Sequence, residues 1–229
     1  TTYTDPYQGT AAAKYPAKKG IKKVAILTNT SSDYSVGLAA AFKEEAAKQG
    51  LQVVEEKYTK DDKDFKSILT NIKNQTPDAI FIPDYYGTVG LIATQAKELG
   101  MTAKYLGGDG WDGVQKDFAA VTEGAVFASQ FAPDDTTPMV QKFIAAYKAK
   151  TGTDPNVFAA LGYDTGNLIE AALKVAKDTS SEAVRDALKG LSLELVTGKL
   201  VFDADRNPQK AVTFVEVKGG KVVLKENDQ

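Results

Sequence analysis

Val24-Ala25-Ile26-Leu27 is a continuous apolar run that leads into a polar loop at residues 28–34. An unbroken apolar run of this length is typical of a strand buried on both faces of a parallel sheet. Similar runs occur at Ala79-Ile80-Phe81-Ile82 and at residues 125–128, and a further strand is expected at residues 103–106. Amphipathic helical segments lie between them. This alternation predicts βαβ units and an α/β fold with a Rossmann-like parallel sheet flanked by helices.

Local signals place the remaining elements of this first part. The first helix is predicted to open at Asp5 and to end near Tyr15, because Pro16 would remove a hydrogen bond from the helix. Residues 52–56 have the pattern of an edge strand. A further helix is expected from Phe65 to Ile72, whose apolar residues recur at helical spacing.

The pattern changes after residue 131. Helices are predicted at 136–150, 156–177 and 181–188, with no parallel strand between them. Strands follow at 199–202, 212–217 and 222–224, the last two joined by Gly219-Gly220, a hairpin-turn signal. Three consecutive amphipathic helices need a layer to cover. They therefore form a small helical satellite, or a second sheet is supplied from elsewhere.

Composition excludes several classes of function. The formal net charge is −2, which does not favour a nucleic-acid partner. Apolar runs of about six residues are far shorter than the roughly 20 needed to span a bilayer. The chain has no Cys and no His, so it lacks thiolate ligands, the commonest general base and the commonest transition-metal ligand. We expect no cofactor and no metal site, and the acidic clusters at 61–64 and 203–207 are interpreted as a helix start and a turn.

The loop Gly107-Gly108-Asp109-Gly110-Trp111 follows the strand at 103–106. Its glycines allow sharp turns and a close approach of the backbone to a ligand. A carboxylate and the only tryptophan of the chain, delivered beyond a strand end, suggest a small pocket for a positively charged group.

Two other strand ends carry aromatic residues: Tyr34 follows the first strand, and Tyr85-Tyr86 follow the strand at Ala79–Ile82. Ligands of open α/β sheets bind beyond the carboxyl ends of the strands, where Asp109 and these tyrosines would meet. Each residue alone is also compatible with packing or with a turn. Tyr163-Asp164 interrupts an apolar helix, either facing a pocket or making a helix–helix hydrogen bond.

These residues resemble the leucine/isoleucine/valine-type periplasmic binding proteins, the substrate-binding components of branched-chain amino-acid ABC transporters. The resemblance extends over nearly all of the chain. The segments that carry it are Thr4-Asp5-Pro6-Tyr7-Gln8-Gly9, Val24-Ala25-Ile26-Leu27, Ser32-Asp33-Tyr34-Ser35-Val36-Gly37, Asp64-Phe65, Pro77-Asp78-Ala79-Ile80-Phe81, Tyr85-Tyr86, Gly124-Ala125 and Ala160-Leu161-Gly162-Tyr163-Asp164.

The resemblance implies two Rossmann-like lobes that close on a small, branched-chain or other aliphatic amino acid. It assigns ligand binding to Tyr34, Tyr85, Tyr86 and Asp109, with Asp109 holding the α-ammonium group. Trp111 would shape the side-chain pocket, and Gln8 lies on the crossover segment near the cleft. The implied partner is a membrane permease. The implied location is periplasmic or extracellular, with a lipid anchor in a Gram-positive source.

The sequence departs from the family at its beginning, because family members normally start with a longer segment that forms the sheet of the first lobe. We therefore expect a mature or trimmed chain that lacks this segment. Residues 1–131 and 211–229 would form the α/β ligand-binding lobe, and residues 132–210 a helical segment of an incomplete first lobe. The uncovered helices would pack on another copy of the chain or rearrange, and we expect self-association.

Alternatives remain at this stage. A ligand-sensing receptor or regulatory domain of the same fold, and a truncated fragment without ligand binding, both fit the sequence. An α/β enzyme that uses Asp109 and a tyrosine as an acid–base pair is disfavoured, since the chain has neither His nor a nucleophile elbow. We expect a binding protein and not an enzyme.

Overall fold

A computed structural model describes residues 1–228, and the chain divides into two compact units. Residues 5–129 and 214–225 form one of them, called here the α/β unit. Residues 1–4, 130–213 and 226–228 form the other, called the helix–hairpin unit. Within the described residues, no helix has both the length and the apolar character that crossing a membrane requires.

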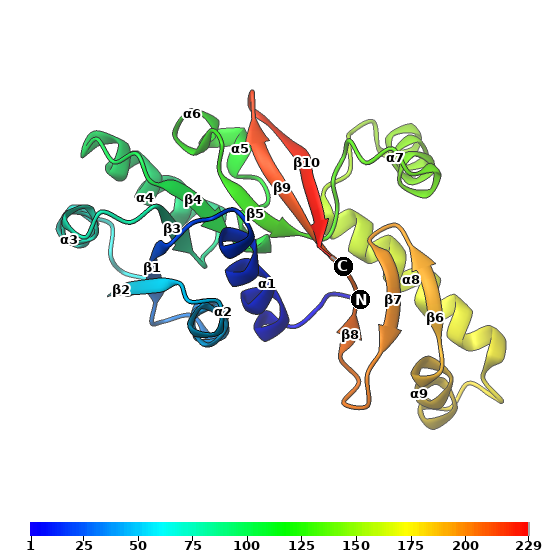
Figure 1. Cartoon of the computed structure of the whole chain (residues 1–229). Helices are drawn as coiled ribbons and strands as arrows, with labels where there is room; N and C mark the ends of the chain where they lie inside the picture. The colour runs from blue at the N-terminus through cyan, green and yellow to red at the C-terminus, as the bar shows by residue number, and fades with distance from the viewer. Residues whose placement is uncertain (229) are drawn as a thin grey trace. The chain divides into compact units, whose positions relative to one another are not determined.

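A seven-stranded sheet organises the α/β unit, in the order β10-β9-β5-β4-β3-β1-β2 (Figure 1). Each neighbouring pair among β1 to β5 runs parallel, which confirms the predicted α/β class. The predicted edge strand β2 lies at an edge of the sheet. The strands are β1 (Lys23–Asn29), β2 (Gln52–Tyr58), β3 (Ala79–Ile82), β4 (Lys104–Gly107), β5 (Val126–Ser129), β9 (Val212–Lys218) and β10 (Lys221–Asp228). As predicted, Gly219 and Gly220 form the β9–β10 turn, and both have positive φ.

Helices cover both faces of this sheet. Figure 1 shows α1 and α2 on one face and α3, α4 and α6 on the other. The bounds are α1 (Asp5–Lys18), α2 (Asp33–Lys48), α3 (Lys66–Asn74), α4 (Tyr86–Glu98), the short 3₁₀ helix η1 (Asp109–Trp111), α5 (Val114–Asp117) and α6 (Ala119–Thr122). Gly9 lets α1 approach α2 closely, because a Cβ there would lie 2.6 Å from the Leu38 carbonyl oxygen.

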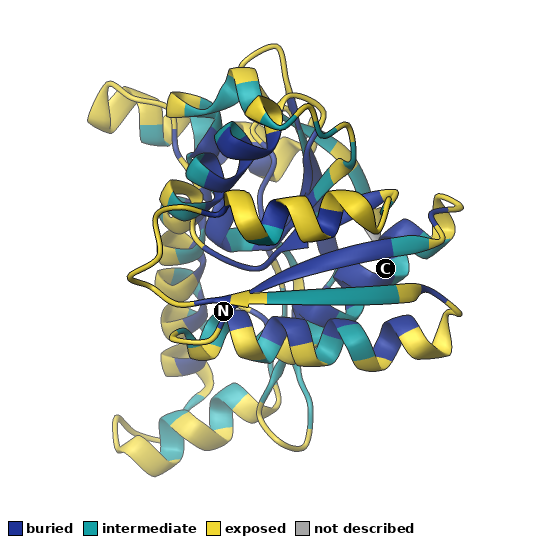
Figure 2. Ribbon diagram, turned by 90° about the vertical axis from the view of Figure 1, so that its left-hand side faces the viewer, coloured by how far each residue is buried: buried dark blue, intermediate teal, exposed yellow. Residues whose placement is uncertain are grey.

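The core of the α/β unit lies between the sheet and its helices. β3 is buried along its whole length, and in β1 only Lys23 is partly exposed, as expected for parallel strands covered on both sides. Figure 2 shows these strands in dark blue between helices whose outward faces are exposed. The carboxyl ends of β1, β3 and β4 therefore lie at the edge of a well-packed sheet, and the sheet positions the loops that follow these strands.

One helix boundary was predicted wrongly. Pro16 does not end the first helix, because α1 continues to Lys18. Proline removes only its own amide, and the Lys19 amide still donates to the carbonyl oxygens of Tyr15 and Pro16 at 3.2 and 3.1 Å. Pro16 is also buried, so its packing offsets the lost hydrogen bond near the helix end.

The helix–hairpin unit contains a small sheet, of which the sequence predicted only the strand at 199–202. Its helices are α7 (Pro138–Thr151), α8 (Val157–Val175) and α9 (Ser181–Lys189). They are followed by β6 (Ser192–Leu195), β7 (Gly198–Phe202) and β8 (Pro208–Gln209) in one antiparallel sheet. The segment at 132–210, described from its sequence as helical with one strand at 199–202, therefore also contains β6 and β8. β6 has only four residues, too few for its alternation to stand out in the sequence.

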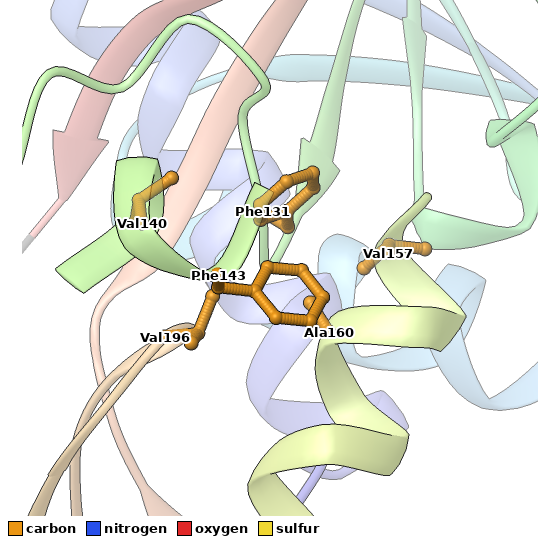
Figure 3. Close-up of a cluster of buried hydrophobic side chains, with 6 residues drawn as sticks. All are labelled: Phe131, Val140, Phe143, Val157, Ala160 and Val196. Atoms are coloured by element: carbon orange, nitrogen blue, oxygen red, sulfur yellow. The ribbon is translucent and has the colours of Figure 1, made fainter. Parts of the chain in front are cut away.

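Two apolar clusters hold this unit together. In the first, Phe143 of α7 packs against Val157 and Ala160 of α8 and against Val196 of the β6–β7 turn (Figure 3). Phe131 and Phe143 meet edge to face, with ring centroids 6.0 Å apart. In the second, Leu168 of α8 packs on Leu195 and Leu200 of the hairpin. One side of α8 therefore has a partner within its own unit.

Asp164 joins the same helix to the hairpin turn. Its buried carboxylate accepts hydrogen bonds from the Val196 amide at 2.9 Å, the Thr197 amide at 2.8 Å and the Thr197 hydroxyl at 2.7 Å. The polar interruption of the apolar helix at Asp164 is thus explained by a helix–hairpin contact, which neither of the two earlier alternatives described.

A buried lysine lies beside this contact. The Lys210 ammonium donates to the Thr197 hydroxyl and, at 3.4 Å, to the Thr1 carbonyl oxygen. Its side chain is 5% exposed. Burial lowers the pKa of Lys210 from 10.5 to about 8, with the Asp164 charge acting in the opposite direction.

Stability should consequently rise with pH through Lys210. Below about pH 8 the Lys210 amine is protonated in both the folded and the unfolded protein, and burying this cation destabilises the fold fully. Above that pH the folded protein releases the proton before the unfolded protein does, so the free energy of unfolding rises. Relative to Lys210→Met, the free energy of unfolding of the wild type should increase by up to about 3 kcal/mol between pH 7.5 and 10.5. Urea unfolding of both proteins across this range measures the difference. A difference independent of pH would contradict the account.

Candidate ligand-binding site at the strand ends

The end of β4 and the loop after it are packed so tightly that a Cβ at either of two glycines would clash with a neighbouring side chain. A Cβ on Gly107 would lie 2.3 Å from the Trp111 ring. A Cβ on Gly108 would lie 2.2 Å from Gln8 Oε1 and 2.5 Å from the Tyr34 hydroxyl oxygen. The glycines therefore allow side chains from α1 and α2 to reach the backbone of this loop.

Hydrogen bonds then fix the loop to those two helices. The Tyr34 hydroxyl donates to Asp109 Oδ1 at 3.1 Å and accepts from the Gly110 amide at 3.0 Å. Gln8 Oε1 accepts from the Asp109 amide at 3.2 Å. Burial and the Asp109 charge raise the pKa of Tyr34 far above its ordinary value, so its hydroxyl stays a donor. Within the described part of the chain, Asp109 Oδ2 accepts no hydrogen bond.

A second carboxylate, Asp5 at the start of α1, contributes to the same field. Burial and, after it, the negative charge of Asp109 raise the pKa of Asp5. Asp5 also acts on the pKa of Tyr34. The sequence reading assigned Asp5 only to helix capping, and nothing in a single sequence shows that the start of α1 faces the loop after β4. Together the two carboxylates favour a cation at this edge.

A buried polar network supports the site from below. Asp84, just after β3, accepts from the Tyr58 hydroxyl at 2.5 Å, from Asn29 Nδ2 at 3.0 Å and from the Tyr85 amide at 2.7 Å. These donors come from the ends of β2 and β1 and from the residue that follows Asp84. The sequence reading missed this network, although Asn29 and Asp84 are polar residues placed directly at strand ends. The network holds the backbone from which Tyr85 projects.

The aromatic residues differ in their placement. Tyr85 and Tyr86 are exposed at 55% and 45%, and the Tyr85 ring stacks on Tyr34 with centroids 5.1 Å apart. Trp111 is fully buried; its indole Nε1 donates to the Ile82 carbonyl oxygen at 2.8 Å, and its ring stacks on Phe127. The structure brings together four of the predicted site residues, Gln8, Tyr34, Tyr85 and Asp109. Tyr86 lies beside Gly113. Trp111 lies in the core beneath the loop.

This arrangement can accept hydrogen bonds from a cation and can present aromatic faces to an apolar group. Among the described residues, no group of three or more acidic side chains is arranged to hold a metal ion. The site therefore places a carboxylate oxygen that accepts no hydrogen bond within the described chain beside exposed aromatic ring surface.

Substituting Gly108 by alanine should damage this network. The new Cβ would force Gln8 and Tyr34 away from the loop, so we expect a loss of about 1–3 kcal/mol in the free energy of unfolding. Gly87→Ala is the matched control: it lies in α4 with open space around it and should be neutral or slightly stabilising. Chemical denaturation of both variants tests this. A Gly108→Ala protein as stable as Gly87→Ala would contradict the predicted close packing.

Most of the chain matches one protein family. Residues 1–221 match the model of a family described as periplasmic binding protein. The leucine-, isoleucine-, valine-, threonine- and alanine-binding protein of Pseudomonas aeruginosa is 28% identical over 204 residues, which are 87% of this chain and 54% of that protein.

Two solved structures are similar over almost the whole chain. A leucine-binding protein from Thermotoga maritima has a TM-score of 0.89 and 31% identity, covering 98% of this chain and 66% of that one. A branched-chain amino acid transporter substrate-binding protein from Streptococcus pneumoniae, in complex with isoleucine, has a TM-score of 0.85 and 35% identity, covering 99% and 65%. The chain thus spans between about half and two thirds of the length of these similar proteins.

Proposed function

This chain belongs to the periplasmic binding protein family, and from that premise we propose that it binds a small amino acid as the solute-binding component of an ABC transporter. The observation that carries the proposal is the Asp109 carboxylate, which is held by the Tyr34 hydroxyl and keeps one oxygen available for a ligand. The ligand's α-ammonium group would occupy this position.

Charge supports an amine over a simple carboxylic acid. Asp5 and Asp109 bring two negative charges to the site, and the pKa of Asp5 is raised partly by that proximity. An ammonium group relieves this repulsion, whereas an anion increases it. The Tyr34 hydroxyl and the Gly110 amide already donate hydrogen bonds within the protein, so neither of these two groups is available to an anion.

The tyrosines support an aliphatic side chain on the ligand. Tyr85 and Tyr86 expose apolar ring surface next to the Asp109 loop, and burying such surface contributes about 25 cal/mol per Å². Similar proteins are named for leucine, isoleucine and valine binding, which agrees with a branched-chain or other aliphatic amino acid. Trp111 acts by supporting the loop from the core, and Gln8 by orienting the Asp109 amide.

The wider setting follows from the same proposal. The protein would lie in the periplasm or outside the cell and deliver its ligand to a membrane permease. A lipid anchor in a Gram-positive source stays a prediction from the resemblance. Similar proteins bind solutes, and we propose that this chain binds its ligand without chemical turnover. We also propose that residues 1–131 and 211–229 act as one ligand-binding lobe and residues 132–210 as part of another.

Calorimetric titration with a panel of amino acids tests the proposal. Leucine, isoleucine or valine should give heat with a dissociation constant of about millimolar, because specificity usually needs both walls of a cleft. Asp109→Asn should weaken this binding at least about tenfold, since a charge-assisted hydrogen bond is lost.

Asp117→Asn is the matched control, because Asp117 is exposed in α5, and it should leave the affinity unchanged. Equal affinity of Asp109→Asn and wild type would contradict the assignment of the ammonium site. Release of a new product from any amino acid would contradict a purely binding role.

We propose in addition that the helix–hairpin unit associates with a second copy of the chain. The side of α8 away from its buried residues exposes Phe158 at 62%, Ile169 at 48% and Leu173 at 46%. Phe158, Ile169 and Leu173 lie on one side of α8, which is called here the apolar stripe, and exposed apolar side chains on one helix face favour association.

Sedimentation velocity at rising protein concentration tests this association. The wild type should shift toward dimer, and Ile169→Glu with Leu173→Glu should stay monomeric, because charge on the stripe opposes its burial. Glu170→Lys serves as a control for charge alone, because the Glu170 side chain is exposed beside the stripe. A wild type that stays monomeric at the highest concentration would overturn the proposal.

A further inference from the structure

A cavity lies wholly within the helix–hairpin unit, between α9 and the end of β7 with the loop that follows it. Its volume is about 470 Å³, and its lining includes Leu188 and Lys189 of α9, Phe202 at the end of β7, and Arg206 of the loop. This size falls within the range of about 300–1,000 Å³ that is typical of small-molecule sites. The site at the ends of β1, β3 and β4 does not account for this cavity.

Positive charge dominates the rim. Arg185, Lys189 and Arg206 contribute three cations and Asp186 one carboxylate. Within the described residues, the side chains of Lys189 and Arg206 make no hydrogen bond or ion pair. Arg185 pairs with the adjacent Asp186 at 2.8 Å, but both side chains are more than half exposed. Such a pair contributes little and leaves further guanidinium donors free.

Arg206 is held in an unusual backbone conformation. Its φ is +69°, in the left-handed region that favours glycine. Asp203 fixes this turn, because its Oδ1 accepts from the amides of Asp205 and Asn207 at 2.9 and 2.8 Å, and its carbonyl oxygen accepts from the Arg206 amide at 3.1 Å. The turn thus keeps the long cationic side chain of Arg206 at the cavity. Glycine would adopt this positive φ with less backbone strain.

The floor of the cavity is apolar. Leu188 and Phe202 are half-buried and pack against the cluster formed by Leu168, Leu195 and Leu200. Both therefore keep apolar surface that a ligand could cover. A free guanidinium group beside such a surface matches a molecule with a planar anionic head and an apolar body.

From this cavity we propose a second binding site, specific for a small amphipathic carboxylate. Arg206 and Arg185 would bind the carboxylate, Lys189 would add charge, and Phe202 with Leu188 would pack on the apolar part. The site is made only from residues of the helix–hairpin unit. It therefore stands independently of the amino-acid site at Asp109.

Titration of the full chain with 2-naphthoate tests the site, followed by calorimetry. Two comparison probes separate the contributions: 2-naphthalenemethanol keeps the apolar body without the charge, and acetate keeps the charge without the body. The naphthoate should bind at least about tenfold more tightly than either, because both halves of the site are needed. Excess leucine should leave naphthoate binding unchanged.

Variants locate the binding. Arg206→Gln should weaken naphthoate binding about tenfold, and Arg206→Gly should weaken it equally while folding well, since glycine accepts the positive φ. Arg185→Gln should have a smaller effect, because Asp186 already occupies part of that guanidinium. Lys174→Gln, on α8 and paired with Glu170, is the matched control for loss of one positive charge.

Three results would overturn the site: no heat with naphthoate at its solubility limit, equal affinity for naphthoate and the alcohol, or Arg206 variants that bind as the wild type does. Displacement of naphthoate by leucine would also overturn it, since the ligand would then occupy the Asp109 site. Retained naphthoate binding without any amino-acid binding would support this site and contradict only the proposed function.

Discussion

The close contact of α1 and α2 with the loop after β4 is the constraint on which the candidate site depends. Gly108 has no room for a Cβ because Gln8 and Tyr34 already lie against it. This contact lets one hydroxyl, that of Tyr34, hold both the Asp109 carboxylate and the Gly110 amide. The sheet supplies the rigid edge and the glycines supply the space. The carboxylate is consequently fixed in place before any ligand arrives, which lowers the entropy lost on binding.

Much of the α/β unit could be predicted from the sequence, because buried parallel strands are written as continuous apolar runs. Because the carboxyl ends of parallel strands meet at one edge of a sheet, Tyr34, Tyr85 and Asp109 were expected there, and the structure brings these three together. Asp5 could not be predicted as a neighbour of Asp109, since that proximity depends on how α1 packs. Trp111 illustrates the opposite limit: a tryptophan beside a glycine-rich loop fits a pocket wall and a core position equally well in sequence, and the structure buries it.

The helix–hairpin unit was harder to predict because its signals are short and depend on distant partners. Asp164 interrupts an apolar helix for a reason visible only once the β6–β7 turn is seen to donate to it. β6 itself is four residues long, and its strand character comes from pairing with β7. The same pairing leads into the loop that carries Arg206 in a strained conformation. This unit therefore combines a stabilising polar contact with a cavity that its own packing leaves open.

The central claim is that Asp109 recognises an ammonium group, and the carboxyl ¹³C resonance of Asp109 reports on it most directly. Leucine, isoamylamine and 4-methylpentanoate share an apolar body but differ in their amine and carboxylate groups. The account predicts that leucine and isoamylamine shift this resonance while 4-methylpentanoate does not. A shift with 4-methylpentanoate equal to that with leucine, or no shift with saturating leucine, would contradict the claim.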